Sequence, residues 1–184
     1  LRAIAHVARL TQMGVHSLKI EGRTKSYYYC ARTAQVYLKA FDDAAAGKPF
    51  DPQLLETLEG LAHRGYTEGF LRRHTHDDYQ NYEYGFSVSE RQQFVGEFTG
   101  ERKGELAAVL VKNKFTVGDS LELMTPQGNI NFTLEQMENA KGEAMPVAPG
   151  DGYTVWMPVP EDIDLNYALL MRNFASESTR NPHA

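Results

Sequence analysis

The feature that most constrains the fold is a change of sequence pattern near Arg91. Before it, apolar residues recur at the three- and four-residue spacing of amphipathic helices. After it, they form short runs separated by turn residues, at positions 94–98, 107–111, 120–124, 129–134 and 152–158. A chain that carries both patterns in this order predicts an α+β protein, with helices first and strands second.

The second half is predicted to form a small all-β unit over residues 91–175. Closing its sheet would remove exposed strand edges, so we expect a small β-barrel. After Leu165 the sequence shows one short amphipathic stretch, and the polar segment 176–184 is expected to be a disordered tail.

The first half opens with a helix, a strand and a helix within residues 1–48. The first helical pattern ends at Gly14, a strand-like run covers 15–21, and Ser26 can cap a helix that Gly47 stops. This rhythm is typical of a parallel α/β unit, and one strand cannot form a sheet alone. We therefore expect the partner strands upstream, in agreement with a chain that starts inside a helical pattern without Met.

Residues 49–90 are predicted to be a helical and irregular linker. Asp51 and Pro52 can start a short helix with a leucine stripe, and no periodic pattern persists after His63. Long irregular connections in compact proteins are usually functional or lie between domains.

Composition limits the function classes. A net charge of -5 excludes a surface-wide attraction to nucleic acid and leaves room for a local basic patch. The single cysteine, Cys30, excludes an internal disulfide and suits a reducing compartment. No apolar run approaches the roughly 20 residues of a membrane helix, and no signal peptide is visible. We expect a cytoplasmic, soluble protein that makes no membrane contact.

The first candidate site consists of Lys19, Glu21 and Arg23. They lie at the carboxyl end of the predicted parallel strand, where α/β proteins bind ligands. Glu21 could accept protons or hydrogen bonds, and Arg23 could grip a carboxylate or phosphate with two N–H groups. We interpret the three as candidate catalytic residues. The alternative is a structural Glu–Arg pair.

Two further residues, Tyr28 and Arg64, are candidates for substrate binding. The Tyr28 ring could stack on a base or pack against a neighbouring helix. Arg64 belongs to the glycine-punctuated segment 63–70, which could be a binding loop or a rigid joint between domains.

Metal binding has little support in the sequence. Cys30 alone cannot hold an iron–sulfur cluster, which usually takes four cysteines, so a buried and inert thiol is the better interpretation. One cluster has the residue types that zinc prefers, although no regular element fixes its geometry; its members are His74, His76, Asp77 and Asp78. An exposed polar loop has the same composition, and we predict no metal site.

Basic residues gather near two turns of the β region, and small β-barrels often bind nucleic acid through such loops. The candidate RNA-binding residues are Arg102, Lys103, Lys112 and Lys114, with Asn113, Phe115 and Trp156 nearby in the sequence. The alternative is a solvated charged rim.

Three segments together resemble a known family. Residues 17–26 read SLKIEGRTKS, residues 28–33 read YYCART, and residues 63–70 read HRGYTEGF. They resemble the signature sequences of peptidase family U32, and the β region from Phe94 to about Met171 is similar to that family's C-terminal domain. The resemblance covers essentially the whole chain and is closest to the branch that takes part in tRNA hydroxylation.

The resemblance implies a fold and a function. The family's main domain is an incomplete or modified β/α barrel, so residues 1–48 would be the C-terminal remnant of that barrel. Members of this branch act in prephenate-dependent formation of 5-hydroxyuridine at the tRNA wobble position. The implied partners are tRNA and further proteins, with prephenate as a co-substrate. Some relatives carry an iron–sulfur cluster on four cysteines, which the intact protein could hold, whereas this chain supplies Cys30 alone.

Three functions therefore compete. The first is a tRNA-modifying enzyme that uses the site around Glu21. The second is a collagenase-like peptidase, suggested by the family name, although the sequence shows no Ser/His/Asp arrangement, glycine-rich phosphate loop or CxxC motif. The third is a non-catalytic module that docks tRNA or a partner protein. We expect this stretch to play the third role within an enzyme of the first kind, and to be inactive when isolated.

Overall fold

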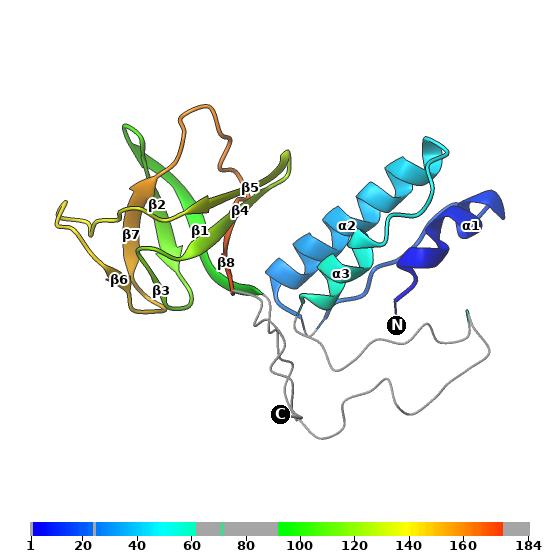
Figure 1. The fold of residues 1–184 in the computed structure, drawn as a ribbon, viewed down its shortest axis with the longest axis horizontal. Coiled ribbons are helices and arrows are strands. Elements are labelled where there is room, and N and C mark those ends of the chain that lie inside the picture. The colour runs from blue at the N-terminus through cyan, green and yellow to red at the C-terminus, as the bar shows by residue number, and fades with distance from the viewer. Residues whose placement is uncertain (1, 24, 62–70, 72–91, 175–184) are drawn as a thin grey trace, which may run out of the picture. The chain divides into compact units, whose positions relative to one another are not determined.

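The computed structural model describes residues 2–23, 25–61, 71 and 92–174. The chain divides into two compact units, Leu1–Glu90 and Arg91–Ala184. In the described residues, helices occupy the first unit and strands the second (Figure 1). The predicted α+β class is therefore confirmed.

The first unit is built around one long helix, α2 (Tyr27–Ala45). Two shorter helices, α1 (Val7–Gln12) and α3 (Gln53–Glu59), pack against it, and a 3-10 turn, η1 (Ile4–His6), precedes α1 (Figure 1). The shared core is apolar and consists of Ile4, Val7, Val36, Ala40, Leu54, Leu58 and Leu61.

The helix ends follow local signals in the sequence. The Ser26 hydroxyl accepts a hydrogen bond from the Tyr29 N–H at 3.2 Å, which caps α2 as predicted. Gly14 after α1 and Gly47 after α2 have φ values of 81° and 67°, a conformation that favours glycine. In both cases the glycine and the next residue donate backbone hydrogen bonds back into the last turn, as a Schellman motif does.

The predicted strand at 15–21 does not form. The structure assigns no helix or strand to residues 15–22. A strand needs a neighbour to bond its backbone groups, and the described residues place none beside this segment. The prediction of a helix–strand–helix unit is thus wrong for the chain as it stands, and the segment remains without a sheet.

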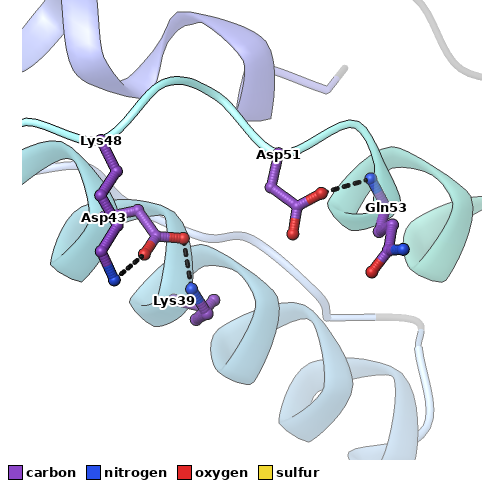
Figure 2. A network of polar contacts seen from close by, with 5 residues as sticks. All are labelled: Lys39, Asp43, Lys48, Asp51 and Gln53. Atoms are coloured by element: carbon purple, nitrogen blue, oxygen red, sulfur yellow. Dashed lines mark hydrogen bonds and ion pairs between the residues drawn. The ribbon is translucent and has the colours of Figure 1, made fainter.

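Two sets of polar contacts lie at the end of α2 and at the start of α3 (Figure 2). The Asp43 carboxylate, whose side chain is 10% exposed, contacts Lys39 Nζ and lies 3.4 Å from Lys48 Nζ. Asp51 accepts the Gln53 N–H at 2.9 Å, as expected of a residue that starts a helix. A carboxylate near a helix C-terminus is unfavourable for the helix dipole, and the two lysines offset that effect.

Acid should weaken the helical unit through Asp43. The hydrogen bond from Lys39 lowers the pKa of this carboxyl below its ordinary value of 3.8. Because the pKa of this carboxyl is lower in the folded protein than in the unfolded chain, the charged carboxylate stabilises the fold at pH values above the unfolded pKa. This stabilisation is lost as the pH falls through the folded-state pKa. We expect Asp43→Asn to lower the helix melting temperature at pH 7, with the difference from wild type closing as the pH falls through the folded-state pKa of Asp43.

Circular dichroism at several pH values measures this effect. Asp42→Asn is the matched control, because Asp42 is an exposed neighbour on the same helix. An Asp43→Asn difference that persists unchanged into acid would show that the carboxylate charge does not contribute.

The second unit is an antiparallel sheet with strand order β5-β4-β8-β1-β2-β7 (Figure 1). Its strands are β1 (Gln92–Lys103), β2 (Leu106–Val111), β4 (Ser120–Thr125), β5 (Gly128–Thr133), β7 (Thr154–Pro158) and β8 (Leu169–Asn173). A separate two-stranded pair joins β3 (Phe115–Thr116) to β6 (Val147–Ala148).

The core of this unit lies on one face of the sheet. Alternate residues of each strand point into it, as the two-residue period of a strand requires. Its fully buried members include Val95, Val109, Phe115, Leu121, Val155, Met157 and Leu170. Each predicted strand overlaps an observed one. β8, which lies between β4 and β1, was expected only as an amphipathic stretch.

The predicted closed barrel is wrong for the described residues. Closure would require β5 to pair with β7, and these strands instead lie at opposite ends of the sheet order. The free edge of β7 is already used, because Trp156 and Glu138 exchange backbone hydrogen bonds of 2.8 and 2.9 Å. The β5 edge is blunted by exposed polar residues such as Asn129 and Asn131.

Candidate functional site

The Lys19, Glu21 and Arg23 side chains meet in the first unit. Glu21 bridges the other two, with its carboxylate 3.0 Å from Lys19 Nζ and 2.6 Å from Arg23 Nε. The Glu21 side chain is 50% exposed, and the Lys19 and Arg23 side chains are almost fully exposed, at 80% and 85%. Exposed ion pairs contribute roughly 0–1 kcal/mol to stability. The trio is therefore a poor structural clamp and is accessible to a ligand.

A pocket of about 560 Å³ opens beside this trio within the same unit. Lys19 and Glu21 line it from the segment after α1, and Arg2 lines it from the chain start. Its apolar surface comes from Leu10, Leu18, Ile20 and Leu58. The volume is in the range of sites that hold small organic molecules.

The α2 helix lines the pocket with three residues that carry hydroxyl groups, Tyr29, Thr33 and Tyr37. Tyr37 accepts the Ala3 N–H at 2.9 Å, and its burial raises the pKa of its hydroxyl despite that hydrogen bond. The phenol therefore keeps its proton at neutral pH and can donate it. The Thr33 hydroxyl is buried without a partner in the described part of the chain.

The sequence reasoning missed this hydroxyl stripe. Tyr29, Thr33 and Tyr37 are spaced by four residues, which places them on one face of a helix. This four-residue spacing could have identified the stripe from the sequence. The predicted substrate residue Tyr28 is instead 7% exposed and lies with its ring 6.0 Å from the Arg32 guanidinium. Arg64, the other predicted substrate residue, lies outside the described residues.

Cys30 packs against the turn after the trio. Its Sγ lies 3.9 Å from the Gly22 carbonyl oxygen, and a Cβ at Gly22 would come within 2.7 Å of that sulfur. Gly22 therefore permits this close approach. Cys30 is half-buried rather than fully buried as expected.

No group of three or more His, Cys, Asp or Glu side chains suited to a metal occurs in the part of the chain that the structure describes. The candidate cluster of His74, His76, Asp77 and Asp78 lies outside that part. Among the described helices, none is long and apolar enough to cross a membrane.

In the second unit, Arg102 differs from the other predicted RNA-binding residues. Its guanidinium donates hydrogen bonds to the carbonyl oxygens of Val159, Pro160 and Ile163, at 3.0, 3.1 and 2.9 Å. Charged donors to backbone oxygens contribute more than neutral ones. Arg102 thus fixes the loop between β7 and β8, and most of its donors face the protein.

The three lysines are placed differently from Arg102. Lys112 Nζ lies 2.9 Å from Glu97 Oε1, with both side chains partly exposed. Lys103 Nζ lies 4.0 Å from the centre of the Trp156 ring. Lys114 is exposed on the loop after β2. The structure thus leaves the lysines, more than Arg102, available to an anionic partner.

Comparison with known proteins places both units in one family. The profile "Peptidase family U32" matches residues 1–81, and the profile "Peptidase family U32 C-terminal domain" matches residues 90–172. The C-terminal domain of a Geobacillus thermoleovorans protein described as a U32 peptidase is similar with a TM-score of 0.40 and 21% identity. That match covers 45% of this chain and 93% of the solved one.

Sequence relatives agree with the profiles. The chain is 88% identical over 183 residues to tRNA hydroxylation protein P of Escherichia coli, and 70% identical over 185 residues to the Haemophilus influenzae protein of that name. A tRNA hydroxylation protein P1 of Bacillus subtilis is 26% identical over 157 residues. The first two matches cover all of this chain and 40% of each relative. Together with the two profiles, these matches show that the chain belongs to peptidase family U32.

Proposed function

We propose that this chain is part of a protein that takes part in tRNA hydroxylation. The observation that carries the proposal is the 88% identity, along the whole chain, to a protein of that name. The chain spans 40% of that relative's length, so we propose the complete activity for the full-length protein and not for this stretch. The two units described above would then supply a small-molecule pocket and an RNA-docking surface.

In this proposal, the first unit contributes to binding the co-substrate. The family resemblance implies prephenate, which carries two carboxylates and a hydroxyl. The lining residues include matching groups, the exposed Lys19 cation and Tyr37 with its neutral hydroxyl. Glu21 holds Lys19 in place through their 3.0 Å contact and can accept a proton from a bound hydroxyl.

The second unit is proposed to dock tRNA through its lysines. The chain as a whole is acidic, with a net charge of -5, so attraction to phosphate must be local. Lys112 and Lys114 lie two residues apart at the end of β2, where a phosphate backbone can reach both. Each lysine–phosphate contact releases counterions, and that makes the affinity dependent on salt.

Charge reversal should expose this contribution. We expect Lys112→Glu with Lys114→Glu to weaken tRNA binding by about tenfold or more at low salt, and to lower the slope of log affinity against log salt by roughly one to two. Fluorescence anisotropy with labelled tRNA at several salt concentrations measures both quantities.

Lys141→Glu is the control, because Lys141 is an exposed lysine of the same unit outside the β2 strand. It changes the net charge by half as much as the double variant does. A loss of log affinity in the control that is half as large as in the double variant would mean that only net charge matters. An unchanged affinity in the double variant would remove these lysines from the docking surface.

A further inference from the structure

The face of the sheet opposite the core carries the single tryptophan of the chain. Trp156 lies on β7 between Val155 and Met157, both fully buried in the core. Because side chains alternate along a strand, the Trp156 ring lies on the other face. Its cross-strand neighbour on β2 is Ala108, a small residue that is fully buried beside the ring.

Lys103 covers this ring. Its ammonium lies 4.0 Å from the ring centre, within the range of a cation–π contact. Lys103 ends β1 and pairs with Leu106, so it reaches the ring across β2. The contact is held by one flexible side chain, and a competing anion can draw that side chain away.

The indole nitrogen has an unmet hydrogen bond. Trp156 is 5% exposed, and among the described residues no acceptor lies within hydrogen-bonding distance of its Nε1–H. Buried donors are normally paired, and an exception calls for an explanation. An oxygen from a bound partner would supply the missing acceptor.

A second cation lies on the same face of the sheet, at the far end of β2. Leu110 alternates with the core residues Val109 and Val111, so its cross-strand partner Glu97 lies on the outer face. Lys112, which contacts Glu97, shares that face with Lys103. The seven residues from Leu106 to Lys112 span roughly 20 Å of strand. Two cations at the ends of such a strip, with a ring at one end, match a single nucleic-acid strand.

We propose that the Lys103–Trp156 pair is a binding site for an unpaired RNA nucleotide. A phosphate draws Lys103 off the indole, and the uncovered ring stacks on the base. This proposal rests on the proposed docking of tRNA by the second unit and adds that the docked segment is single-stranded. Duplex RNA cannot use the ring, because its bases are stacked within the helix.

The lone tryptophan provides a direct readout in the full chain. The probes are a decauridylate and an RNA duplex of the same length, each titrated at fixed salt. We expect the decauridylate to change the Trp156 emission at saturation and the duplex to leave it unchanged. Unchanged emission with saturating decauridylate would overturn the proposal.

Two variants extend the test. Trp156→Phe should bind decauridylate about tenfold more weakly and should bind the duplex as wild type does. Lys103→Met keeps the aliphatic stem on the ring and removes the charge, so it should also weaken decauridylate binding. Because both residues act at one site, their combined effect should be smaller than the product of the single effects.

The outcomes separate this inference from the proposed function. If Lys112→Glu with Lys114→Glu abolishes tRNA binding while emission never responds to decauridylate, docking stands and the nucleotide site is wrong. If neither decauridylate nor tRNA binds the intact chain, both proposals fail. Near-ultraviolet circular dichroism of each variant confirms that the sheet has folded.

Discussion

Replacing Gly96 with valine is expected to prevent stable folding of the β unit, or to lower its free energy of unfolding by about 3 kcal/mol or more. A Cβ at this position would lie 2.5 Å from Val109 Cγ1 and 3.1 Å from the Leu110 carbonyl oxygen. Val109 is fully buried, so it has no free space in which to move. Gly96 also lies at a register shift between β1 and β8, where the strand bends.

Denaturant unfolding followed by tryptophan fluorescence measures the effect. Gly96→Ala should show a milder loss, and Val109→Ala should relieve part of it when the two are combined. The double variant is therefore expected to lose less stability than the two single variants added together. If the stability losses of the two single variants are strictly additive in the double variant, the contact between Gly96 and Val109 does not explain the effect.

The second large effect concerns chemistry rather than stability. Glu21→Ala in the full-length protein is expected to reduce tRNA hydroxylation at least tenfold while leaving its melting temperature nearly unchanged. The Glu21 side chain is half exposed, and its partners Lys19 and Arg23 are more exposed still, so the ion pairs contribute little to stability. Its loss would free Lys19 from its position at the pocket rim and remove the proposed proton acceptor.

Glu56→Gln is a suitable control, because Glu56 is an exposed carboxylate on α3 of the same unit. Hydroxylated nucleosides are quantified by mass spectrometry, with the protein level checked in parallel. Normal hydroxylation by Glu21→Ala at a normal protein level would remove Glu21 from the site.

Local signals predicted most of the secondary structure. Ser26, Gly14 and Gly47 mark helix ends because each acts on backbone groups within a few residues. Features that depend on distant partners were not predicted. The strand at 15–21 has the right pattern but no neighbour, and the barrel does not close because Glu138 occupies the β7 edge.

The strand β8 was missed for a different reason. Leu169, Leu170 and Met171 are all buried, because this strand lies between two others and is covered on both faces. A continuous apolar run cannot be distinguished from a piece of buried helix by its period. Only the pairing with β1 and β4 decides the assignment.

The candidate site was predicted in part. Lys19, Glu21 and Arg23 are close in the sequence, so their contact needed no knowledge of the fold. The role of Arg102 could not be foreseen, because its carbonyl partners lie 57 to 61 residues away. The stripe of Tyr29, Thr33 and Tyr37 could have been found from its four-residue spacing, but the pocket that it lines requires α1 and the segment after it.

The proposed role of this chain is to form part of a tRNA hydroxylation protein. It is tested most directly by nucleoside mass spectrometry on tRNA from a strain that lacks the gene, complemented with the full-length gene or with this stretch alone. We expect the full-length gene to restore 5-hydroxyuridine derivatives and this stretch alone to leave them absent. Failure of the full-length gene to restore them, at a normal protein level, would contradict the account.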